Sequence, residues 1–208
     1  MAAAFWANPK RTRVQPTKGH PNETDLKLTT EEKGILLNLA REVIKAKSHG
    51  EELPKPELSS PALNEPRGAF VTLHKQGKLR GCIGHIRAKQ PLAKTVVDMA
   101  VAAAFEDPRF PPVDEKELKS LDLEISVLTP LRRISNVKEI EVGVHGIYMI
   151  QGSCSGLLLP QVATEWGWDR TAFLEHTCIK AGLPENAWKE KDTEIYVFSA
   201  DVFSAENL

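Results

Sequence analysis

The octapeptide KLRGCIGH places a cysteine between two glycines, with an arginine before it and a histidine after it. A cysteine acts as a nucleophile in its thiolate form, and Arg80 can lower the pKa of Cys82. His85 can act as the base if the chain folds it back toward the thiol. The N–H groups around Gly81 and Gly84 resemble an arrangement that stabilises an anion. These residues indicate a candidate catalytic site at Cys82.

Two other interpretations of the same residues stay open. Cys82 can be a small buried side chain that fills a gap where Gly81 and Gly84 let strands cross closely. It can also be a metal ligand, although the histidines and cysteines do not form CxxC, HxH or HExxH pairs. The sequence therefore predicts no metal site and no cofactor.

Charged side chains in other segments could complete a site around Cys82. Glu124 lies on the polar side of the alternating segment LDLEISVLTP, where it could orient a substrate. Arg80 and Arg109 could bind an anionic substrate, and His145 is a second candidate base. The catalytic hypothesis therefore assigns tentative roles to Cys82, His85 and Glu124.

Asp107 and Arg109 flank Pro108 at the predicted end of a helix. They could contact a ligand, or they could form an ion pair with each other that has only a structural role. The residues expected to contact a ligand in a groove are Arg80, Gly81, Gly84, Asp107, Arg109 and His145.

Hydrophobic periodicity predicts the elements that must position these residues. Apolar residues recur at helical spacing in three segments and alternate in the segments between them. The pattern predicts helices over 29–50, 90–107 and 169–182, hairpins over 67–84 and 142–152, a strand over 121–130 and a last strand over 193–204. Because hairpins outnumber βαβ units, we expect an α+β fold with a mainly antiparallel sheet flanked by helices.

The bulk composition excludes several classes of protein. The 208 residues carry a formal net charge of −1, which disfavours binding to nucleic acid by electrostatic attraction. No apolar run approaches the ~20 residues that a membrane-spanning helix requires. Three cysteines at distant spacings argue against a disulfide framework, which favours a cytoplasmic location. Residues 1–27 contain prolines and basic residues and are interpreted as a solvated arm.

The hexapeptide LRGCIG and the blocks around it resemble the AMMECR1 domain family, which is named for a human protein and is widespread in archaea and bacteria. The segments GAFVTL, PLAKTVVDMAVAAAFEDPRFPPV, LDLEISVLTPLRRI and GVHGIYMIQGSCSGLLLPQVATEWGW occur in the family's order. The resemblance covers residues 28–204. It implies a two-lobed domain in which the larger lobe holds both chain ends and a cleft lies near LRGCIG.

The family resemblance implies no established reaction. Members have been suggested to act in regulation linked to nucleic acid, and in microbes they resemble partners of Memo-like proteins and radical SAM enzymes. Three functions are therefore carried forward. The favoured one is a binding or regulatory module for a small molecule or a protein; the alternatives are a cysteine-dependent enzyme acting on a small anionic substrate and a nucleic-acid-linked regulator.

Overall fold

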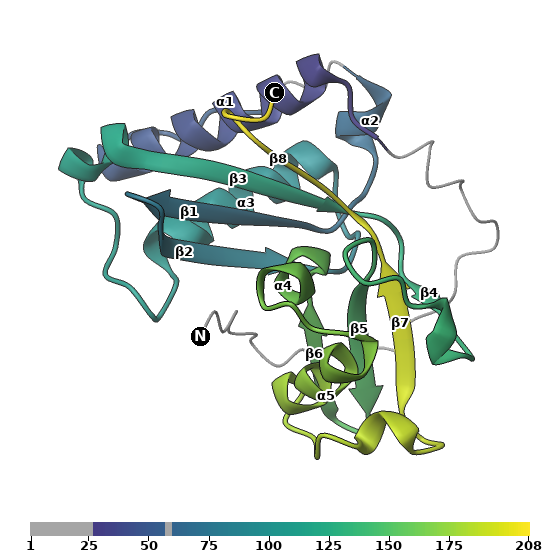
Figure 1. Ribbon diagram of the computed structural model, residues 1–208. Helices are drawn as coiled ribbons and strands as arrows, with labels where there is room; N and C mark the ends of the chain where they lie inside the picture. The colour runs from purple at the N-terminus through teal and green to yellow at the C-terminus, as the bar shows by residue number, and fades with distance from the viewer. Residues whose placement is uncertain (1–26, 57–59) are drawn as a thin grey trace. The chain divides into compact units, whose positions relative to one another are not determined.

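The computed structural model describes residues 27–56 and 60–208, which form two compact units (Figure 1). The first unit holds the described chain up to Leu128 together with Asp201–Leu208, and the second unit holds Thr129–Ala200. The predicted arm, residues 1–27, lies outside the described residues except for its last position. Helices and two sheets confirm the α+β class.

The first unit is built on a four-stranded sheet with the order β2-β1-β3-β8. Strands β1 (Ala69–Lys75), β2 (Lys78–His85) and β3 (Leu121–Leu128) pair antiparallel, with β1 in the middle. The predicted turn between β1 and β2 is confirmed, because Gln76 and Gly77 both have positive φ angles, as a two-residue hairpin turn requires. Strand β8 (Ala200–Ser204) lies beside β3.

One face of this sheet packs against the two long helices, α1 (Thr30–Ser48) and α3 (Leu92–Phe105). Alternate residues of each strand enter this core, as expected for a sheet with one buried face. The sheet contributes Ala69, Val71, Leu73, Leu121, Leu123, Ile125 and Val127. The residues between them therefore point to the opposite face of the sheet.

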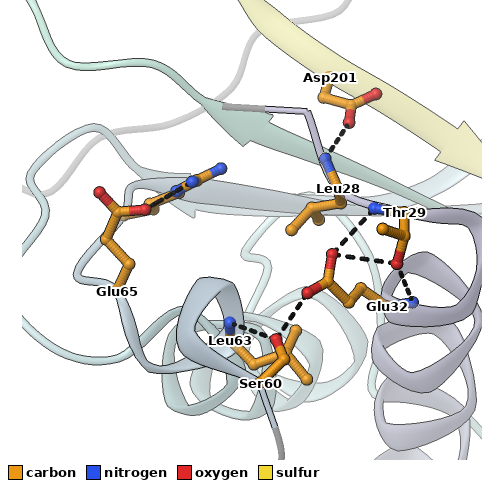
Figure 2. A network of polar contacts seen from close by, with 8 residues as sticks. Leu28, Thr29, Glu32, Ser60, Leu63, Glu65 and Asp201 are labelled. Atoms are coloured by element: carbon orange, nitrogen blue, oxygen red, sulfur yellow. Dashed lines mark hydrogen bonds and ion pairs between the residues drawn. The ribbon is translucent and has the colours of Figure 1, made fainter. Parts of the chain in front are cut away.

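The start of α1 is fixed by a network of polar contacts (Figure 2). The Thr29 hydroxyl accepts a hydrogen bond from the Glu32 N–H, and the Glu32 carboxylate accepts one from the Thr29 N–H at 2.8 Å. These two hydrogen bonds form a reciprocal capping box, which fixes the first turn of the helix predicted over 29–50. Glu32 also accepts a hydrogen bond from Ser60, which caps the short helix α2 (Pro61–Asn64). Asp201 of β8 accepts hydrogen bonds from the Leu28 N–H and from the Lys33 side chain.

The second unit is built on a sheet with the order β4-β7-β5-β6. Its strands are β4 (Arg132–Arg133), β5 (Gly146–Gln151), β6 (Cys154–Leu158) and β7 (Glu194–Phe198). Helices α4 (Pro160–Glu165) and α5 (Arg170–Lys180) pack with it around a separate core. Short 3-10 helices are η2 (Glu115–Ser120) in the first unit, and η3 (Val137–Glu139) and η4 (Ala187–Lys189) in the second.

The structure corrects two expectations at this level. The segment 193–204 was expected to be one strand, but it forms β7 and β8, which belong to different sheets. Ser199 belongs to neither strand and separates β7 from β8. Apolar and polar residues alternate on both sides of it, so the sequence pattern does not reveal the change of sheet. The helix predicted over 90–107 begins two residues later than expected, because α3 starts at Leu92 and Pro91 occupies its N-cap position.

No helix within the described ranges is long and apolar enough to cross a membrane.

Candidate functional site

Cys82 belongs to a row of three polar side chains that crosses the first sheet. The strand register places Cys82 of β2 opposite Thr72 of β1, and Thr72 opposite Glu124 of β3. These residues alternate with the core residues, so the row lies on the face away from α1 and α3. The Thr72 hydroxyl donates a hydrogen bond to the Cys82 sulfur, with 3.2 Å between Oγ1 and Sγ. The structure therefore brings the sequence-predicted residues Cys82 and Glu124 into one row.

The backbone of Cys82 is held by two side chains from the turn that follows α3. The Cys82 N–H donates to Asp107 Oδ2 at 2.9 Å, and Arg109 Nη2 donates to the Cys82 carbonyl oxygen at 3.1 Å. Strand β2 is at the edge of its sheet, so these backbone groups have no neighbouring strand. The carboxylate and the guanidinium take the places of a strand's C=O and N–H and cover the open edge at Cys82.

Asp107 and Arg109 are also paired with each other, as one of the two sequence interpretations predicted. Arg109 Nη2 and Nε lie 2.6 and 2.9 Å from the two Asp107 oxygens, and the Arg109 N–H donates to Oδ1. Asp107 is only 4% exposed, so the ion pair lies largely out of water. We refer to Asp107 and Arg109 as the edge clamp. Its double hydrogen bonding fixes the geometry more firmly than a single ion contact would.

The electrostatic environment keeps the Cys82 thiol protonated. Burial is the largest influence and raises the pKa of Cys82 above its usual value. The Thr72 hydrogen bond and the Arg109 charge act in the opposite direction, while Asp107 and Glu124 add to the rise. A thiol whose pKa is raised is a poor nucleophile at neutral pH.

Asp107 is ionised despite its burial. Burial alone would raise the pKa of its carboxyl group, but hydrogen bonds from the Arg109 side chain and the Cys82 N–H outweigh it and lower that pKa below its usual range. The same pairing raises the pKa of Arg109. The edge clamp is therefore a charged pair at neutral pH.

His85 does not serve as a base for Cys82. The two residues are three apart on one extended strand, so their side chains point to opposite faces of the sheet. His85 pairs with Ala69 at the end of β2, and burial lowers the pKa of its imidazole. The condition on which His85 was a candidate base, that the chain folds it back toward the thiol, is not met, because His85 is the last residue of strand β2.

Arg80 is neutralised by an acid that the sequence reasoning did not identify. Its Nη2 lies 2.9 Å from Glu117 Oε2, and Lys75 contacts the other oxygen of the same carboxylate at 3.0 Å. Arg80 and Arg109 both approach the Phe110 ring, at 6.0 and 5.4 Å from its centroid. Both predicted anion-binding arginines therefore have carboxylate partners within the protein. Glu117 lies 37 residues from Arg80, and nothing in the local sequence pairs them.

The two glycines are required for close packing within the first unit. A Cβ atom on Gly81 would lie 2.2 Å from the carbonyl oxygen of Ala103 in α3, and one on Gly84 would lie 2.3 Å from the Phe70 ring. Neither glycine has a positive φ angle. Their role is to let a helix and an aromatic ring reach the strand. Both contacts lie within the first unit.

His145 belongs to the second unit, where it is buried and accepts a hydrogen bond at Nδ1 from the Glu141 N–H at 3.0 Å. This contact closes the turn before β5 and indicates a structural role. All three cysteines are unpaired thiols, and no three His, Cys, Asp or Glu side chains gather within the described chain as a metal site would require.

Comparison with known proteins gives a consistent assignment. The AMMECR1 family model matches residues 37–203. The chain is similar to Protein MK0488 of Methanopyrus kandleri, with 46% identity over 86% of this chain and 91% of the relative. It is also similar to a Pyrococcus furiosus protein, with 44% identity over 83% of this chain and 87% of the relative.

A solved structure supports the fold. The crystal structure of the uncharacterized protein PH0010 from Pyrococcus horikoshii matches with a TM-score of 0.78 and 42% identity, and covers 83% of this chain and 90% of that one. The names of these relatives assign no biochemical activity. The family model spans well over half of the residues, and so the chain belongs to the AMMECR1 family.

Proposed function

We propose that this protein is a binding module that recognises its ligand with the sheet face formed by Cys82, Thr72 and Glu124. The observation that supports the proposal is how Cys82 is held. The Thr72 hydroxyl donates to its sulfur, the edge clamp fixes its backbone, and burial raises the pKa of its thiol. Groups that are held rigidly on strands suit recognition, because little conformational entropy is lost on binding.

The same observation argues against a cysteine-dependent enzyme. Covalent catalysis requires a thiolate and a base within hydrogen-bond reach of the sulfur. Here burial raises the pKa of the Cys82 thiol, and the neighbouring hydroxyl of Thr72 donates to the sulfur rather than removing its proton. His85 points to the opposite face.

The chemistry of the row indicates what kind of ligand it would take. The Cys82 sulfur, the Thr72 oxygen and the Glu124 carboxylate are all hydrogen-bond acceptors. Glu124 and the nearby Asp107 are also close enough to disfavour a negative charge on the sulfur. We therefore propose a ligand that presents a hydrogen-bond donor or a cation, such as a primary ammonium or a guanidinium group.

The proposal can be tested by titrating the ¹⁵N-labelled protein with butylammonium and, as a matched control, with butanoate. We expect butylammonium to shift the amide resonances of Cys82, Thr72 and Glu124, and butanoate to leave them unchanged. The variant Glu124→Gln should weaken the response, and Cys82→Ser should retain it. Equal shifts with both compounds, or no shifts at these residues, would contradict a site of this charge preference.

The remaining expectations from the family resemblance are also proposals. Memo-like and radical SAM proteins are proposed partners. A purified member of either family should bind the Glu124→Gln variant of this protein more weakly than it binds the wild type. We propose a cytoplasmic location, which the three unpaired cysteines support. A nucleic-acid role is disfavoured by the net charge of −1, and the basic residues that would carry it lie outside the described ranges.

A further inference from the structure

A small groove lies on the helix side of the first sheet, away from Cys82. It has a volume of about 170 Å³ and is formed by α1, η2 and the start of β3. Its apolar lining comes from Ile44, Leu118, Leu121 and Leu123. The last two belong to the core face of β3, whereas Glu124 belongs to the other face. This groove is therefore separate from the proposed ligand-binding row.

The polar lining of the groove is strongly biased toward positive charge. Arg41, Lys45 and Lys119 are basic and Glu42 is the single acid, which leaves an excess of two positive charges. Lys45 and Glu42 are 3.9 Å apart and more than half exposed, so their contact is weak. In the described chain, no ion pair is formed by Arg41 or Lys119. The groove therefore presents unneutralised cations around an apolar floor.

The size and polarity of the groove favour a protein segment over a small molecule. Pockets for small molecules usually enclose about 300–1,000 Å³ and place a few polar groups inside to orient the ligand. This groove is smaller, and its buried floor residues Ile44, Leu121 and Leu123 carry no polar side-chain atoms. An apolar pocket for one side chain, surrounded by polar groups, is the usual form of an anchor site in protein–protein interfaces.

We propose that the groove binds an acidic segment of a partner protein that inserts one leucine or phenylalanine side chain between α1 and η2. The apolar side chain fills the space above Leu118, Leu121 and Leu123. Acidic residues on either side of it pair with Arg41 and Lys119. The excess positive charge also speeds the approach of an acidic partner at low ionic strength.

The test uses the full chain and a fluorescein-labelled synthetic peptide with the sequence EEDFEDE, measured by fluorescence anisotropy at low salt. Matched peptides replace the phenylalanine by glycine or every acid by lysine. The exposed positions permit the variant Arg41→Glu/Lys119→Glu without loss of the core, and thermal melting checks its folding. The variant Lys138→Glu/Lys191→Glu makes the same change of net charge at two exposed positions of the second unit and is the matched control.

We expect EEDFEDE to bind the wild type and Lys138→Glu/Lys191→Glu with the same affinity. The affinity should fall by at least about tenfold with either altered peptide, and also with the variant Arg41→Glu/Lys119→Glu. In ¹⁵N spectra, the shifts should centre on the groove residues. The proposal is overturned if the glycine peptide binds as well as EEDFEDE, if Arg41→Glu/Lys119→Glu binds unchanged, or if no binding occurs at about 1 mM peptide. Hexanoate that binds the same residues more tightly than the peptide would also overturn it, in favour of a small-molecule site.

Discussion

The two units contain similar short sequences that the structure treats differently. Gly81-Cys82 lies on β2 and the segment Gly152–Gly156, with Cys154 at its centre, lies at β6; both strands are outermost in their sheets. In each, a glycine lets a helix approach: Gly81 faces the carbonyl oxygen of Ala103, and a Cβ atom on Gly156 would lie 2.4 Å from the Ala181 nitrogen at the end of α5.

The difference between the two segments is what surrounds the cysteine. Cys154 pairs with Gln151 at the tight end of a hairpin. Cys82 lies within its strand, and the edge clamp from a distant turn fixes its N–H and C=O. A glycine-flanked cysteine on an outer strand is therefore a common packing solution in this protein. The clamp and the polar row distinguish the LRGCIG segment, and they come from other parts of the chain.

The largest loss of stability is expected when Gly81 or Gly156 is replaced, and it tests whether β2 and β6 depend equally on the close approach of a helix. Gly81→Val and Gly156→Val both force a side chain into helix backbone that cannot move aside, and each should cost about 4 kcal/mol or more, enough to prevent folding of its unit. Circular dichroism and urea titration measure this loss. Gly34→Ala in α1, where a Cβ atom meets nothing within 4 Å, is the matched control and should stabilise the protein by about 0.5–1 kcal/mol. A folded Gly156→Val would show that only β2 depends on close approach.

The second prediction isolates the edge clamp. Asp107→Asn retains the shape of the side chain but leaves Arg109 without its charge partner, so the free energy of unfolding should fall by about 2 kcal/mol. In the second unit, Glu139 pairs with Arg132 in an exposed position. Glu139→Gln should therefore leave the urea midpoint nearly unchanged. Equal losses of unfolding free energy in Asp107→Asn and Glu139→Gln would mean that the buried edge clamp stabilises the fold no more than an exposed ion pair does.

The third prediction concerns pH and uses the same variant. The pKa of Asp107 is lowered in the folded protein, so its ionised form stabilises the fold above the unfolded pKa of about 3.9. This contribution is lost as pH falls through the lower, folded-state pKa. The stability difference between wild type and Asp107→Asn should therefore narrow from pH ~5 downward. A difference that stays constant to pH ~2 would contradict the ionised clamp.

The smallest effect on stability is expected at the cysteine itself. Cys82→Ser preserves the size of the side chain and the neighbouring Thr72 hydroxyl, and should cost less than about 1.5 kcal/mol. The raised pKa of the Cys82 thiol also predicts that iodoacetamide modifies Cys82 more slowly at neutral pH than it modifies free glutathione. Mass spectrometry of timed samples distinguishes Cys82 from Cys154 and the buried Cys178. Modification faster than that of glutathione would restore the enzyme hypothesis.

Much of the fold could be predicted because its signals are local. The capping box at Thr29 and Glu32, the turn at Gln76-Gly77 and the alternation around Glu124 each need only a few neighbouring residues to be recognised. The division of residues 193–204 between two sheets could not be predicted in this way. Both halves alternate in the same manner, and only distant pairing partners decide which sheet each joins.

The site was predicted less completely for the same reason. Cys82 and Glu124 were expected to belong to one site, and the strand register places them in one row. Thr72, which lies between them, has no distinguishing local pattern. The pairing of Asp107 with Arg109 was one of two interpretations, whereas their hold on the Cys82 backbone depends on a contact across 25 residues. His85 was a candidate base only if the chain folds back after Cys82, whereas β2 continues to His85 and its alternation turns the imidazole away from the thiol.

The passage of the chain from β7 to β8 has a consequence for its synthesis. All four strands of the second sheet lie between Arg132 and Phe198, so every strand of this sheet has been made once Phe198 is added. The first sheet is complete only when β8 has been made and pairs with β3, although β1, β2 and β3 are made much earlier. During elongation one edge of β3 therefore stays unpaired while more than 70 further residues are made. An unpaired strand edge is prone to aggregation, so a ribosome-bound chaperone would be most needed in this interval.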